Sequence, residues 1–131
     1  MTDRSDNTSR YARQARHLLA NAAKTSGEEV STATGSKKVG LEKTGEMVWG
    51  AFILAIKAAG AKRGKHLKST AAIKWGKDHG LIAGRDDVAA VNAARALHGR
   101  FYEVDMEYDE FLVAKDAVEV LVDKILIEVG L

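Results

Sequence analysis

The chain has 131 residues with a net charge of +2, 46% hydrophobic and 29% charged residues, and neither proline nor cysteine. Such a length and composition predict one soluble domain, and the absence of cysteine excludes a disulfide scaffold, a thiolate zinc site and a cysteine nucleophile, in keeping with a reducing cytoplasm. The polar first residues lack the apolar segment of a signal peptide, and no apolar run reaches the roughly 18 residues of a membrane span, so we expect a cytoplasmic protein that does not enter a membrane.

Residues 1–8 are expected to form a disordered tail, and residues 9–131 a single helical bundle domain. A first helix is predicted from an N-cap at Thr8 or Ser9 to about residue 24. Its inward stripe is made of Tyr11, Ala15, Leu18, Leu19 and Ala22. The polar stretch 25–38 is expected to be a flexible connection.

The next element is the stretch 45–61, GEMVWGAFILAIKAAGA, in which only Glu46 and Lys57 are charged. At about 100° per residue one face is broadly apolar, and the reverse face is small enough for another helix to approach closely. The residues of that reverse face are Gly50, Ala51, Leu54 and Ala58. We therefore expect a buried central helix, and its excess of apolar surface over what one small bundle covers predicts a homodimer.

Three further helices are predicted after this one. A short helix over about 66–78 has Leu67, Ala71 and Trp75 on its inner line, and Asp86 is placed to cap a fourth helix that runs to about residue 104. The last helix, over about 109–129, repeats apolar residues at helical spacing. Short connections predict an all-α fold, an up-down helical bundle of about five helices, whose core contains Trp49, Phe52, Ile56, Leu97, Phe101, Leu121 and Ile125.

Charge is distributed unevenly between the two halves of the chain. Residues 1–80 hold 15 Lys and Arg against 7 Asp and Glu, whereas residues 81–131 hold 5 against 11. The stretch 57–77 has seven basic residues and no acid. This asymmetry fits an acidic ligand such as nucleic acid, and equally a basic helix that faces an acidic one in the same or a neighbouring subunit.

Two groups of residues are candidates for a site. Arg95, His98 and Tyr102 are spaced by three and four residues, so a regular helix places them on one stripe, where a sheltered histidine beside an arginine suits acid–base chemistry on a phosphate. The alternative is a structural histidine hydrogen-bonded to a backbone carbonyl or to an acid. The second group, which lies at the start of the short third helix and suits anion binding, contains Arg63, Lys65, His66 and Lys68.

No metal site is predicted, because no two histidines stand three or four residues apart and thiolates are lacking. No cofactor is expected either, since the sequence has no glycine-rich phosphate loop.

The stretch GEMVWGAFILAIKAAGAKRGKH, followed by ARALHGRFYE and a last amphipathic helix, resembles the PaREP-type small helical proteins and, through them, the HEPN superfamily. The resemblance covers about residues 9–129. It implies an up-down bundle, frequent homodimers and, in catalytic members, metal-independent RNA cleavage by an arginine and a histidine four to six residues apart. Arg95 and His98 have only two residues between them, so that ribonuclease motif is not reproduced here.

Two functions remain open. The first is a non-catalytic HEPN-like module, homodimeric, that binds a nucleotide, RNA or a protein partner such as a nucleotidyltransferase. The second is a metal-independent ribonuclease of toxin-like type, with His98 as general base, Arg95 stabilising charge and Tyr102 orienting the phosphate.

Overall fold

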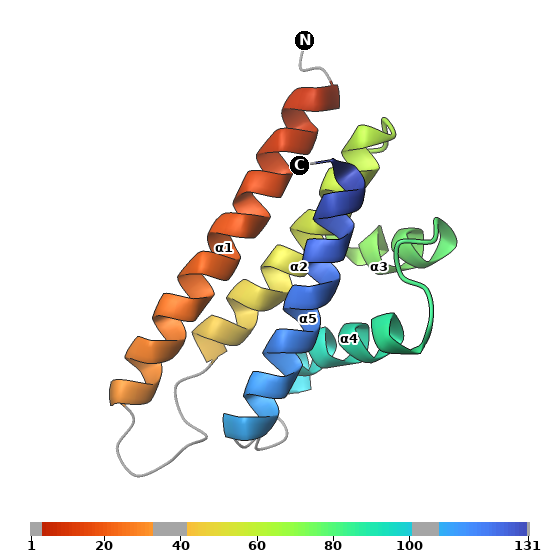
Figure 1. Ribbon diagram of the computed structural model, residues 1–131. Coiled ribbons are helices and arrows are strands. Elements are labelled where there is room, and N and C mark those ends of the chain that lie inside the picture. The colour runs from red at the N-terminus through yellow and green to blue at the C-terminus, as the bar shows by residue number, and fades with distance from the viewer. Residues whose placement is uncertain (1–3, 33–41, 101–107, 131) are drawn as a thin grey trace.

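The computed structural model describes residues 4–32, 42–100 and 108–130 of the chain, and within these ranges all regular structure is helical. This confirms the predicted all-α fold, with five α-helices packed together (Figure 1). The elements in chain order are α1 (Arg4–Thr32), α2 (Glu42–Lys62), α3 (Ser69–Asp78), α4 (Arg85–Arg95), the π-helical turn η1 (Ala96–Arg100) and α5 (Tyr108–Val129).

Helix α2 is the centre of the fold and packs against every other element. Helix α1 runs antiparallel to α2 along one side, and α5 runs along another side in the same direction as α2 (Figure 1). Helices α3 and α4 run across the direction of α2 and α5, and α4 meets α5 at a steep angle in the view of Figure 1. The expected central helix is therefore present.

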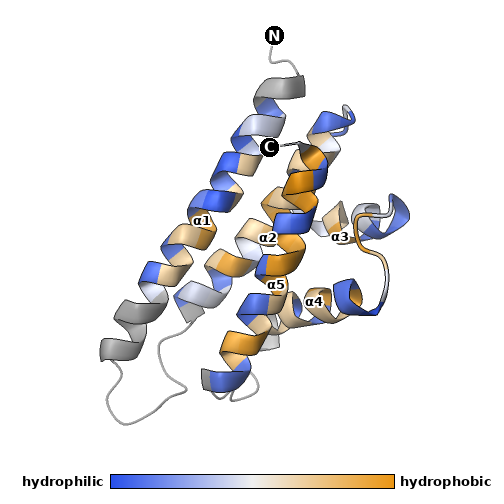
Figure 2. Ribbon diagram, in the orientation of Figure 1, coloured by the Kyte–Doolittle hydropathy of each residue, from blue (hydrophilic) through white to orange (hydrophobic). Residues whose placement is uncertain are grey.

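The sequence of α2 explains its central place. Large side chains alternate with alanine, so several neighbours can approach its backbone while apolar area is removed from water. Figure 2 shows that α2 and α5 carry most of the apolar colouring, whereas α1 is largely hydrophilic. The apolar α2 residues with no or almost no exposed surface are Val48, Ala51, Phe52, Ile53, Ala55, Ile56, Ala58 and Ala59.

Most of the predicted core is confirmed. Phe52, Ile56, Leu97, Leu121 and Ile125 are fully or almost fully buried in one cluster. Trp49 is partly buried and packs against this cluster, while Phe101 lies outside the described residues. The inward stripe of the first helix also holds, since Ala15 and Ala22 are buried and Tyr11, Leu18 and Leu19 pack against the core.

The boundaries of α1 differ from the prediction. The helix begins at Arg4 and continues to Thr32, so it takes in most of the expected tail and much of the stretch expected to be a flexible connection. Thr8 lies inside the helix and is buried, so it does not act as an N-cap. Residues 33–41 lie outside the described part.

The short helices also differ from prediction in detail. Helix α3 begins at Ser69, and its buried line is Ala72 and Gly76 rather than Ala71, which is exposed. Helix α4 has Gly84 at its N-cap, with φ 88°, so Asp86 does not cap it. It ends at Arg95, where the chain enters η1.

Asp87 joins α4 to α5 and to the preceding turn. Its carboxylate accepts a hydrogen bond from the Ala83 backbone N–H at 3.0 Å and forms an ion pair with Lys124 of α5. Burial acts to raise the pKa of Asp87, but the hydrogen bonds from Lys124 and Ala83 and the charge of Lys124 outweigh it, so the pKa is lowered. The charged carboxylate thus stabilises the folded chain.

We expect Phe52→Ala to lower the free energy of unfolding by about 3–5 kcal/mol, because the ring is fully buried at the centre of the fold. Chemical denaturation followed by circular dichroism measures the change. Val88→Ala is the control, since this side chain is 43% exposed and its loss should cost less than about 0.5 kcal/mol. A loss of less than about 1 kcal/mol for Phe52→Ala would contradict the packing.

A second expectation concerns Asp87→Asn. The folded-state pKa of Asp87 is below its unfolded value. Its contribution to the free energy of unfolding is therefore complete at pH values above the unfolded pKa and is lost as the pH falls through the folded pKa. The variant should be less stable than the wild type by about 1–3 kcal/mol at neutral pH, and the difference should shrink in acid. Denaturation at a series of pH values tests this. Asp78→Asn, which breaks an exposed pair with Lys74, should cause no measurable change.

Candidate functional site

The first candidate site is the contact between η1 and the start of α2. An added Cβ at Gly45 would lie 2.8 Å from the Leu97 carbonyl oxygen, so only glycine allows this approach of the two backbones. Leu97 itself is fully buried. The close approach at Gly45 and the burial of Leu97 hold η1 on α2, and they set the position of the next residue, His98.

His98 stacks on one aromatic ring of α2 and bonds to a carboxylate of the same helix. Its Nδ1 lies 3.1 Å from Glu46 Oε2, and its ring lies over that of Trp49 with centroids 4.4 Å apart and planes 11° apart. Trp49 in turn makes an edge contact with Phe52 at 6.1 Å. The side chains of His98 and Glu46 are 48% and 41% exposed, so the pair is in contact with water.

This arrangement corresponds to the alternative in which the histidine bonds to an acid. Arg95 is exposed on α4, and in the described part of the chain it has no hydrogen bond or ion pair with His98. Tyr102 lies outside the described residues. Glu46 and Trp49 could not be found from spacing, because they lie about fifty residues before His98. Chemically, an imidazole held at Nδ1 by a carboxylate has Nε2 available for proton exchange.

The second candidate site is the turn between α2 and α3. The predicted residues Arg63, Lys65, His66 and Lys68 are all exposed there. The turn is fixed by Gly64, with φ 77°, and by a hydrogen bond of 2.8 Å from the Lys65 N–H to the Gly60 carbonyl. Three cationic side chains and one imidazole thus project from one short segment of defined backbone, and all four face solvent.

Two aromatic rings of α3 and its C-cap extend this basic turn. The Arg63 guanidinium carbon lies 5.4 Å from the centre of the Trp75 ring, and the His79 ring stacks on Trp75 with centroids 4.2 Å and planes 20° apart. His79 Nδ1 also lies 2.8 Å from the Trp75 carbonyl oxygen, which fixes the imidazole. The four-residue spacing of Trp75 and His79 is a signal for such a pair, whereas the position of Arg63 depends on tertiary structure.

We name the surface formed by Arg63, Lys65, His66, Lys68, Trp75 and His79 the α2–α3 basic face. None of its cationic side chains forms an ion pair with a carboxylate in the described part of the chain. The neighbouring Lys74 pairs with Asp78 at 2.8 Å, and Lys62 donates to the Val129 carbonyl at 2.8 Å. The acidic side chains described in the C-terminal half therefore leave the charge of the α2–α3 basic face unneutralised.

A shallow pocket of about 200 Å³ borders this face where α2 and α5 end. Its lining combines two cations, one carboxylate and apolar side chains: Ala59, Lys62, Arg63, Leu81, Glu128 and Val129. The described residues contain no group of three or more acidic, histidine or cysteine side chains that could hold a metal ion. None of the described helices is long and apolar enough to span a membrane.

Comparisons of the chain with protein-family models, with curated proteins and with solved structures find no match.

His98→Ala should lower the free energy of unfolding by only about 1 kcal/mol, because the contact with Glu46 is exposed and a single ring stack is worth about 0.5–1.5 kcal/mol. In a Trp75→Phe background the tryptophan emission comes from Trp49 alone, and we expect it to change when the imidazole is removed. His66→Ala is the control, since His66 is exposed on the other site. Unchanged Trp49 emission would contradict the stack, and a loss above about 3 kcal/mol would contradict the exposure of His98.

Proposed function

We propose that the protein is a non-catalytic helical module that binds single-stranded RNA through the α2–α3 basic face. The observation that carries the proposal is the stack of Arg63, Trp75 and His79 beside cations that have no acidic partner in the described chain. Single-stranded nucleic acids are bound by this combination, in which lysine and arginine meet phosphates while unpaired bases stack on aromatic and guanidinium planes. The sequence resemblance to the HEPN superfamily adds support.

The parts of the face have different roles in this proposal. Lys65 and Lys68 supply charge that follows the phosphate backbone and carries no base preference. The exposed ring of His79, held parallel to Trp75, supplies a plane on which a base can stack. Arg63, which lies over Trp75 and lines the neighbouring pocket, links the charged part to the aromatic part.

Fluorescence anisotropy of a labelled oligouridylate at several salt concentrations tests the proposal. Lys65→Ala with Lys68→Ala should weaken binding about ten-fold at low salt and lower the salt slope by about 1–2, since two phosphate contacts are lost. His79→Ala should weaken binding several-fold with an unchanged salt slope, because stacking releases no counterions.

The matched control removes two positive charges from another surface. Lys43 and Arg85 are exposed on α2 and α4, outside the α2–α3 basic face, and Lys43→Ala with Arg85→Ala should leave RNA affinity nearly unchanged. Equal weakening by the two double variants would contradict a specific face, and so would a wild type that does not bind the oligonucleotide.

A metal-independent ribonuclease remains the second candidate, and the Glu46–His98 contact is the observation that favours it. A carboxylate that orients an imidazole is a common feature of general bases. Cleavage of the same oligonucleotide in the presence of a chelator, abolished by His98→Ala, would support this candidate over the non-catalytic module.

A further inference from the structure

A row of exposed apolar side chains runs along the outer face of α5. Val113, Val120 and Ile127 are 71%, 69% and 74% exposed and stand seven residues apart, so they line up on one face of the helix. We name these three residues the α5 stripe. Each of these three large aliphatic side chains is left in contact with water, and together they give one face of α5 apolar area that a partner could cover. The complementary face of α5 is fully used in the core.

The residues beside the α5 stripe define the kind of partner that fits it. Asp109, Asp116 and Asp123 are exposed and also stand seven residues apart, so carboxylates accompany the stripe over its whole length. Lys124 is the one exposed cation of α5 on this face in the described chain, and Asp87 already neutralises it. The stripe therefore fits a helix whose surface is basic and offers small residues to receive the aliphatic side chains.

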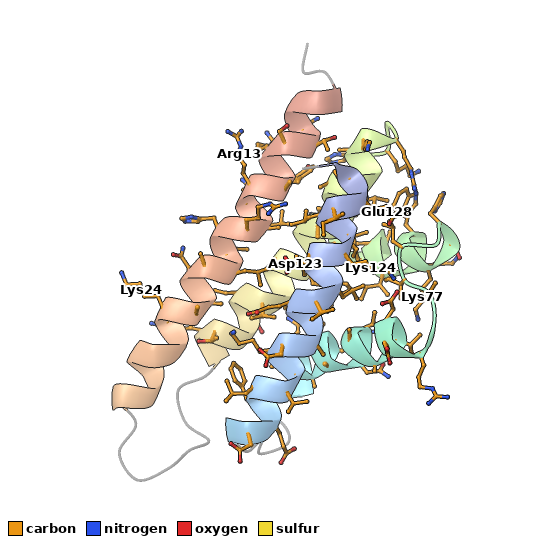
Figure 3. All side chains as sticks on the ribbon, in the orientation of Figure 1. Arg13, Lys24, Lys77, Asp123, Lys124 and Glu128 are labelled. Carbon is orange, nitrogen blue, oxygen red and sulfur yellow. The ribbon has the colours of Figure 1, made fainter. Side chains whose placement is uncertain are left out.

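Helix α1 of the same protein has such a surface. Between residues 7 and 25 it carries four basic residues and no acid, and Arg10, His17 and Lys24 repeat every seven residues as the aspartates of α5 do. Ala20 and Ala23 are exposed between these cations and leave room for valine and isoleucine. Figure 3 shows Arg13 and Lys24 directed outward from α1.

These two complementary faces do not meet within one chain. Helices α1 and α5 both pack on α2 and have at most marginal contact with each other. In the described part of the chain, no ion pair joins Arg10, Arg13 or Lys24 to an aspartate of α5. Within the described residues, Arg10, Arg13 and Lys24 of α1 thus face solvent opposite no aspartate of α5, and a second molecule can supply that charge.

We infer that a second copy of this chain covers the α5 stripe, with the outer face of α1 of one copy packed on α5 of the other. A two-fold arrangement makes this contact twice and closes the assembly at a dimer. The surface responsible differs from the one expected from the sequence, because the large apolar residues of α2 are buried or partly buried within the chain. Among the described residues, the large apolar side chains that are exposed lie on α4 and α5. This inference does not depend on RNA binding.

Sedimentation at micromolar concentration tests the dimer. The wild type should sediment as a dimer, and Val120→Asp should raise its dissociation constant about thirty-fold or more, as expected for a central contact of an interface. Val88→Asp is the control, because this exposed valine lies on α4 outside the stripe, and it should leave the constant unchanged. A wild type that is monomeric at every concentration overturns the inference, as does equal weakening by both variants.

Charge reversal tests which helices meet. One variant, Asp116→Lys with Asp123→Lys, makes α5 basic, and the other, Arg10→Glu with Lys24→Glu, makes α1 acidic. Each alone should be monomeric, because like charges then face each other in both contacts. An equimolar mixture should form a heterodimer, since each reversed face meets an opposite charge. A dimer of the α1 variant alone would pair α5 with α5 and overturn the assignment, and so would a mixture that stays monomeric.

Discussion

The close approach of neighbouring backbones to α2 is the constraint on which the rest of the structure depends. Alanine at Ala51, Ala55 and Ala58 gives the helix little bulk on several sides, so α1, α5 and η1 can all reach it. At Gly45 the approach is so close that any side chain would meet the Leu97 carbonyl. Large residues such as Phe52 and Ile56 fill the space between these contacts. Packing at this density leaves little freedom in where each neighbouring helix can sit.

The existence and order of the helices and most of the core could be predicted from the sequence. The spacing of apolar residues follows which side of a helix is buried, and in this chain most helices bury a long face. Phe52, Leu121 and Ile125 could be assigned to the core in this way. Helix ends were less predictable. Thr8 has the chemistry of an N-cap, but it lies inside a helix that begins at Arg4, and its side chain is buried.

The candidate site was predictable only where it is made from neighbouring residues. The cations around Lys65 could be identified as an exposed group from the sequence. The partners of His98 could not, since Glu46 and Trp49 come from another helix. The stripe expected from Arg95 to Tyr102 assumed a regular α-helix, whereas the chain forms a wider π-helical turn from Ala96 onward. Such a turn accommodates an extra residue, so the three- and four-residue spacing of a regular α-helix does not apply within it.

The attachment of α1 has a consequence for how the protein opens. This helix packs almost entirely on α2, and its buried residues there are mainly alanines such as Ala12 and Ala15, which bury little area each. Helices α2, α4 and α5 contact one another and share the large aliphatic and aromatic side chains. The chain therefore has two cooperative units of unequal strength, and α1 belongs to the weaker one. In a single copy of the chain, amide hydrogens of α1 should exchange with solvent through detachment of that helix alone, while those of α2 and α5 exchange only when the whole domain unfolds.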